Sequence, residues 1–160
     1  RAERLAKDTD RYMPAILNLA EAVKASRADQ TLNTPAIATL ILFDEQVRWM
    51  LDNGGLSAME TRARAGANLI HEWAETRPFA SLFVTDPALR SPVTTTVDFA
   101  PQIDVYALAR TLREVGIMDI EGYRKLGRNQ LRIASFPSVE TSDIGSLLAC
   151  LDWMVDQSTS

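Results

Sequence analysis

The spacing of apolar residues changes at Phe79, and this change constrains the fold more than any other feature of the chain. Before Phe79, apolar side chains recur every three or four positions, as they do on one face of a helix. After it, apolar and polar residues alternate, most regularly over residues 93–99, as in a strand with one buried face. The order of these segments predicts an α+β fold, in which long helices are followed by a small, mostly antiparallel sheet with helices packed on one face.

Turn and cap residues set the expected ends of these segments. Residues 1–30 have helical composition, with Pro14 at the start of a second short helix, and residues 30–35 break the pattern as a loop. Gly54 and Gly55 predict the end of the first long helix, because glycine readily takes the left-handed conformation. Ser57 and Glu60 have the spacing of a capping box for the next helix. Helices are expected within residues 36–53, 57–77, 104–116 and 144–155, and strands over 79–84, 93–99, 117–120 and 131–136.

Composition excludes several classes of function. The 160 residues are enough for one domain with a sizeable core, and their net charge of −4 argues against a general nucleic-acid binder. No apolar run approaches the roughly 18 residues that span a membrane. A single cysteine, Cys150, and a single histidine, His71, exclude a disulfide framework, a multi-cysteine metal cluster and a histidine-rich metal site, so no metal is expected.

Two loops are candidates for anion binding. Asn33 and Thr34 lie just before a long helix, where their side chains and the free N–H groups can donate to an anion. From the spacing alone, a simple helix cap with Pro35 in the first turn is the better explanation. Residues 122–128 contain three cations, Tyr123 and two glycines, which suits a phosphate or carboxylate. The alternative for this second loop is a solvated surface segment.

Arg132 is the most informative single residue. It lies in a strand among small and apolar neighbours, where a charge must face a ligand, an internal salt bridge or water. No pairing of a nucleophile with a base can be proposed from the sequence. On these residues alone, the chain is interpreted as a binding domain rather than a complete enzyme.

Two long sequence segments give a more specific hypothesis about the function. QTLNTPAIATL at residues 30–40 and YRKLGRNQLRIA at residues 123–134 resemble the phosphoserine aminotransferase family, a class V branch of the fold-type I transaminases. The resemblance implies a pyridoxal 5'-phosphate enzyme that converts glutamate and 3-phosphohydroxypyruvate into 2-oxoglutarate and phosphoserine. It also implies serine biosynthesis in the cytoplasm and a homodimer with shared active sites.

The resemblance covers only the C-terminal part of the family. It implies that residues 1–35 are the tail of the large cofactor domain, residues 36–77 the connecting long helices, and residues 78–160 the small C-terminal domain. The chain begins with Arg1 rather than Met, and none of its lysines has the family's Schiff-base context. The chain alone is therefore expected to be inactive and not to hold the cofactor by itself.

Residue roles follow from the resemblance position by position. Asn33 and Thr34 match the pair that contacts the cofactor phosphate in the partner subunit's site. Arg132 matches the arginine that binds the substrate α-carboxylate, and Arg124 matches the one that meets the substrate phosphate. Tyr123 stands where many members have histidine.

Two alternatives remain open at this stage. Another class V transaminase that uses a small unphosphorylated keto acid, such as glyoxylate or pyruvate, would need Arg132 but not the cationic loop. A non-catalytic interaction domain would need neither.

Overall fold

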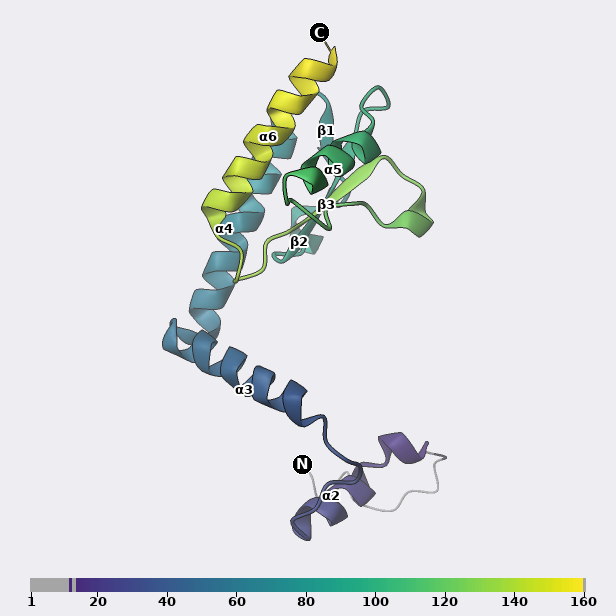
Figure 1. Cartoon of the computed structure of the whole chain (residues 1–160), viewed down its shortest axis with the longest axis vertical. Helices are drawn as coiled ribbons and strands as arrows, with labels where there is room; N and C mark the ends of the chain where they lie inside the picture. Colours follow the sequence, from purple (N-terminus) through teal and green to yellow (C-terminus); the bar gives the residue numbers. More distant parts are fainter. Residues whose placement is uncertain (1–11, 13, 160) are drawn as a thin grey trace. The chain divides into compact units, whose positions relative to one another are not determined.

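The computed structural model describes residue 12 and residues 14–159, and the chain forms two compact units, Arg1–Trp49 and Met50–Ser160. Figure 1 shows the elements in chain order. The boundary between the units falls inside the helix Ile37–Asp52. The domain divisions expected near residues 35 and 77 remain predictions.

The first unit is helical where it is described. A 3₁₀ turn, η1 (Ala15–Leu17), follows Pro14, and α2 (Leu19–Arg27) begins only after Asn18, whose side chain accepts from two backbone N–H groups of its first turn. The short helix expected at Pro14 is thus a single turn, because Asn18 supplies the stronger cap. The rest of the helical expectation for residues 1–13 lies outside the described residues, apart from residue 12. The loop expected at residues 30–35 is confirmed.

Helix α3 (Ile37–Asp52) carries apolar residues at helical spacing, yet none of its residues is buried within this chain. Ile37, Leu40, Ile41 and Leu51 are each more than half exposed. The helix itself is confirmed, and these four side chains of its stripe are exposed.

The second unit begins with a sharp turn between helices. Gly54 has φ of 96° and is the N-cap of α4 (Gly55–Glu75), with no side-chain cap. The capping box expected at Ser57 is therefore wrong: Ser57 lies inside the first turn, where its carbonyl accepts from the Thr61 hydroxyl. Glycine, which has no Cβ, adopts this left-handed conformation without strain, and it offers no side chain to cap the helix.

The sheet has three antiparallel strands in the order β1 (Ala80–Leu82), β2 (Thr94–Phe99) and β3 (Gln130–Ala134). In the central pair, Val97 lies opposite Leu131 and Thr96 opposite Arg132. The strand expected at 117–120 is wrong. That segment makes one backbone hydrogen bond to β3, from the Arg132 N–H to the Ile120 carbonyl, beside an isolated bridge at residue 121.

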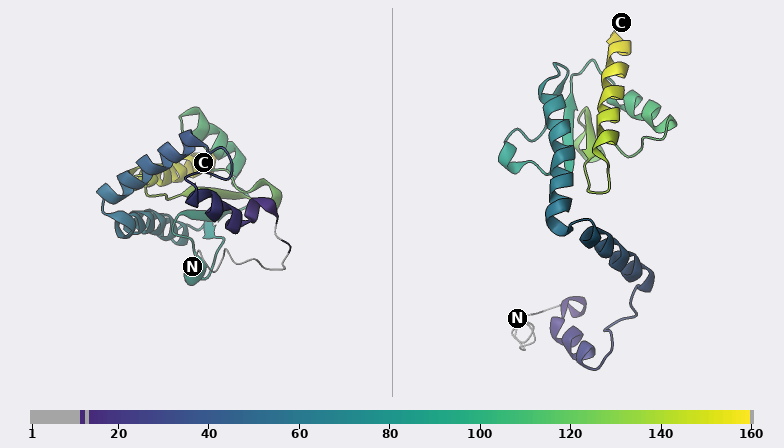
Figure 2. Two further views of the ribbon diagram at one scale, coloured as in Figure 1. Left: turned by 90° about the horizontal axis from the view of Figure 1, so that it is seen from below. Right: turned by 90° about the vertical axis from the view of Figure 1, so that its left-hand side faces the viewer.

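The helices cover one face of the sheet, which confirms the expected architecture. Helices α4 and α6 (Thr141–Thr159) run side by side, and α5 (Val105–Glu114), capped by the Asp104 carboxylate, packs near β3 (Figures 1 and 2). The shared core includes Ile70, Trp73, Val97, Phe99, Leu108, Leu112, Leu131, Ile133, Ile144 and Leu151. The opposite face carries Thr96, Asp98 and Arg132 and is left without a covering layer by the described residues.

One polar cluster joins the end of α4 to α6. The Asp152 carboxylate accepts from the Trp73 indole N–H at 2.9 Å and from the Arg77 guanidinium at 2.9 and 2.7 Å. Trp73 is buried, so its N–H depends on this carboxylate as an acceptor.

Candidate functional site: a cationic pocket beside the edge strand

The three residues expected to bind substrate lie around one pocket. Arg132, Arg124 and Tyr123 line a cavity of about 470 Å³, together with Lys125, Gly122, Arg113, Asp119 and Glu121. The lining therefore contains four cationic side chains and two carboxylates. The positive excess makes this pocket suitable for an anion.

Arg132 reaches the pocket because of strand alternation. Leu131 and Ile133 are buried in the core, so Arg132, between them, must project from the opposite face of β3. Within the described residues, its guanidinium has no ion pair or side-chain hydrogen bond. The internal salt bridge considered for Arg132 is therefore absent there, and five N–H donors remain available to a ligand.

The loop before β3 brings Arg124 and Tyr123 to the same pocket. Tyr123 has extended backbone angles and precedes a single 3₁₀ turn, η3 (Arg124–Leu126), which Gly127 ends with φ of 64°. At the start of the loop, Gly122 packs against β3 so closely that a Cβ atom there would be 2.7 Å from the Gln130 carbonyl oxygen. This close approach holds the loop against the strand that carries Arg132.

Arg128, in the same loop, has a different role. Its guanidinium donates twice to the Asp98 carboxylate, at 3.0 Å each, and lies over the Phe83 ring at 5.2 Å from the centroid. It does not line the pocket. Arg128 therefore anchors the end of the loop to β2.

The two carboxylates of the pocket are held by Arg113, at the end of α5. Its Nη2 lies 2.8 Å from Glu121 Oε1 and 3.2 Å from Asp119 Oδ1. The hydrogen bond from Arg113 is the largest cause that lowers the pKa of Glu121 below its usual range, and the charge of Arg124 lowers this pKa further. Glu121 is thus ionised at neutral pH and within electrostatic reach of Arg124.

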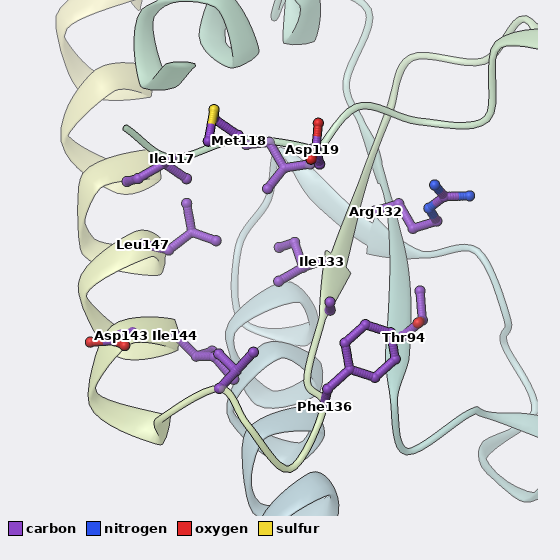
Figure 3. Close-up of a pocket in the computed structure, with 13 residues that line it drawn as sticks. Thr94, Ile117, Met118, Asp119, Arg132, Ile133, Phe136, Asp143, Ile144 and Leu147 are labelled. Atoms are coloured by element: carbon purple, nitrogen blue, oxygen red, sulfur yellow. The ribbon is translucent and has the colours of Figure 1, made fainter. Parts of the chain in front are cut away.

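An apolar cavity of about 510 Å³ adjoins the cationic pocket. Arg132 and Asp119 line both. In Figure 3, Ile133 points toward Leu147 and Ile117, whereas the Arg132 side chain leaves β3 in the opposite direction. Arg132 therefore lies where the two cavities meet, and its side chain points away from the apolar core.

Sequence reasoning missed Arg113, Asp119 and Glu121. Arg113 and Glu121 are eight residues apart, and positive φ values at Gly116 and Asp119 fold the chain between them. A glycine after a predicted helix was the only local signal of this turn.

His71 lies in α4, next to the buried residue Ile70. It is half-buried, and its Nε2 lies 3.1 Å from the Thr95 hydroxyl. Burial is the main cause that lowers its pKa, and the charge of Arg90 adds to this effect.

No group of three or more histidine, cysteine, aspartate or glutamate side chains among the described residues could hold a metal ion. Nor does any helix in the described part have the length and hydropathy of a membrane span.

Asn33 and Thr34 belong to the first unit and lie in an exposed loop. Neither side chain makes a hydrogen bond within the described residues, so both are free to donate. Lys24 and Lys125 are exposed, and Lys7 lies outside the described residues. Neutral donors of this kind fit a phosphate, whereas both described lysines are exposed to solvent and neither is enclosed by a pocket that could hold a Schiff base. These residues therefore fit only the phosphate end of a pyridoxal phosphate group.

Comparison with known families identifies the chain. The model of the family "Aminotransferase class-V" matches residues 14–126. The chain belongs to this family. Class-V aminotransferases are pyridoxal-phosphate enzymes, and this membership agrees with the sequence segments at residues 30–40 and 123–134.

Curated relatives of this class-V chain are named as phosphoserine aminotransferases. A phosphoserine aminotransferase of Corynebacterium glutamicum is 48% identical over 148 residues, which cover 92% of this chain and 39% of the relative. A protein of Mycolicibacterium vanbaalenii, provisionally named a phosphoserine aminotransferase, is 50% identical over 147 residues, which cover 92% of this chain and 40% of the relative. The chain thus spans about two fifths of the length of the curated relatives it matches.

Solved structures share the class-V fold. A phosphoserine aminotransferase from Bacillus circulans subsp. alkalophilus superimposes with a TM-score of 0.81 at 21% identity, over 95% of this chain and 40% of that one. One from Cytophaga hutchinsonii gives 0.74 at 22% identity, over 94% and 39%. At these identities the likeness concerns the fold alone.

Proposed function

We propose that this chain is the C-terminal part of a phosphoserine aminotransferase, in which Arg132, Arg124 and Tyr123 bind the substrates. The observation that carries the proposal is the convergence of these three residues on one cationic pocket. The 48% identity to a relative of that name supports the same reading. The reaction is the exchange of an amino group between glutamate and 3-phosphohydroxypyruvate, in serine biosynthesis in the cytoplasm.

Arg132 binds the α-carboxylate that both substrates share. Its planar guanidinium can make two parallel hydrogen bonds to a carboxylate, which orient the ligand as well as bind it. Orientation matters because the reacting carbon must be held at the cofactor. The strand supports this role, because the buried neighbours Leu131 and Ile133 fix the backbone on either side of Arg132.

Arg124 binds the group at the other end of the substrate. In one half-reaction this group is the phosphate of the keto acid, and in the other it is the side-chain carboxylate of glutamate. Tyr123 adds one phenolic hydrogen bond to the same group.

The cofactor site is proposed to be shared between two subunits. Asn33 and Thr34 would contact the phosphate of pyridoxal 5'-phosphate bound by the partner subunit of a homodimer, and their free side chains support this assignment. When bound in the intact protein, the cofactor supplies the electron sink for amino-group exchange. The chain's own residues bind and orient the substrates.

The test uses the longest reading frame that encodes this chain. Release of 2-oxoglutarate from glutamate is followed with 3-phosphohydroxypyruvate, glyoxylate or pyruvate as acceptor, and the 160-residue chain, expected to give no turnover, is the control. Strong preference for the phosphorylated acceptor is the expected result. Turnover with only the small acceptors would favour the other class V reading, and no turnover with cofactor bound would contradict both.

A further inference from the structure

The cationic pocket contains two carboxylates that compete with any anionic ligand. Glu121 lines the same cavity as Arg124 and Arg132, and the charge of Arg124 already acts on it. An anion site with a carboxylate in its wall works only if something else neutralises that carboxylate. In this structure the neutralising group is Arg113.

The geometry of Arg113 suits this task. It lies in the last turn of α5, and its Nη2 is 2.8 Å from Glu121 Oε1 and 3.2 Å from Asp119 Oδ1. The Glu121 side chain is 36% exposed, whereas that of Asp119 is 89% exposed. Glu121 is therefore the less hydrated carboxylate and the stronger competitor if it is released.

We propose that Arg113 is a positioning residue of the anion site: it holds the Glu121 carboxylate against α5 and so leaves Arg124 and Arg132 free for the phosphate and carboxylate of the substrate. This inference rests on the function proposed above. Without Arg113, Glu121 pairs with Arg124 inside the pocket and excludes the ligand anion. The competing pair is partly exposed, so the expected loss of anion affinity is modest, roughly two- to fivefold.

A double-mutant cycle tests this role. Inorganic phosphate is titrated into the 160-residue chain at constant ionic strength, and binding is followed by the amide NMR shifts of residues 122–127. The variants are Arg113→Gln, Glu121→Gln and the double variant. Because the double variant loses one charge of each sign, it has the same net charge as the parent, and long-range electrostatics are matched.

Two further variants serve as references. Arg110→Gln removes one positive charge from the same helix, at an exposed residue that does not line the pocket. Arg124→Gln removes a proposed phosphate ligand directly. Dispersed amide spectra establish that each variant is folded.

The expected result is a two- to fivefold higher Kd for phosphate in Arg113→Gln, with the parent Kd restored in the double variant and unchanged in Arg110→Gln. A double variant as weak as Arg113→Gln would overturn the proposal, since Arg113 would then act on the anion itself. An unchanged Kd in Arg113→Gln would overturn it too, even if Arg124→Gln weakens binding and the proposed function stands. If Arg124→Gln has no effect, or the parent binds no phosphate, the proposed pocket fails and this inference fails with it.

Discussion

Replacement of Asp152 by alanine should lower the free energy of unfolding by about 2–3 kcal/mol. The Asp152 carboxylate is the acceptor for the Trp73 indole N–H and for two N–H groups of Arg77. Trp73 is 6% exposed, so without the carboxylate its N–H has no water to replace the lost partner. A buried donor left unsatisfied costs about 1–3 kcal/mol, and this is the largest part of the expected loss.

Asparagine at the same position separates the two contributions. Asp152→Asn keeps an oxygen for the indole and removes only the charge that faces Arg77. It should therefore cost about 1 kcal/mol, clearly less than alanine. Urea unfolding of the 160-residue chain, followed by far-UV circular dichroism, measures both free energies. Equal losses for alanine and asparagine would refute the argument that the buried indole dominates.

The same cluster predicts a dependence on pH. The hydrogen bonds from Arg77 are the largest cause that lowers the pKa of Asp152, and the Trp73 indole lowers it further. A carboxyl with a lowered folded-state pKa stabilises the fold fully above its unfolded pKa of about 3.9 and loses this contribution as the pH falls through the folded value. The stability difference between the parent and Asp152→Asn should thus shrink below about pH 4. A difference that stays constant down to pH 2.5 would contradict this assignment.

Two other substitutions have direct readouts. Because burial lowers the pKa of His71, the unfolded chain binds a proton more readily than the folded chain, and the stability should fall as the pH drops below about 6.5. In His71→Gln the urea midpoint of unfolding should therefore depend less on pH between about pH 5 and 7. A pH dependence as steep as that of the parent would contradict the assignment. Gly66→Ala would place a Cβ atom 3.1 Å from Ser135 Cβ and 2.7 Å from Ile144 Cδ1, and the end of the Ile144 side chain can rotate away. Alanine also favours a helix over glycine by about 1 kcal/mol, so the net loss in the same assay should be small, about 0–1 kcal/mol, and a loss above about 3 kcal/mol would mean that the side chains cannot adjust.

The sheet and its helical layer could be predicted from local patterns. Alternation around Val97 and Leu131 identified the central strands, because one buried face imposes a period of two. The same reasoning singled out Arg132 as a charge among apolar neighbours, and the structure leaves it without an internal partner among the described residues. The alternation of buried and exposed residues is a local property of a strand, so these features can be predicted without knowing the fold.

Other features depend on contacts that no local pattern encodes. Residues 117–120 are mostly apolar, as in a strand, but Asp119 has φ of 63° and interrupts the extended backbone. The contact of Arg113 with Glu121 requires the turn that follows α5. Ser57 has the sequence spacing of a helix cap, yet the helix begins two residues earlier, at Gly55, with Gly54 as its N-cap.

The central claim is that Arg132 and Arg124 bind different ends of one phosphorylated substrate, and paired substitutions in the protein from the longest reading frame test it most directly. Values of kcat/KM are compared for 3-phosphohydroxypyruvate and pyruvate in Arg132→Gln, in Arg124→Gln and in the control Arg110→Gln. Arg132→Gln should lower both values by roughly 10- to 100-fold, because both acceptors carry the α-carboxylate. Arg124→Gln should lower only the value for the phosphorylated acceptor, by about 10-fold or more. Equal losses for both acceptors in Arg124→Gln, or none for either, would contradict the account.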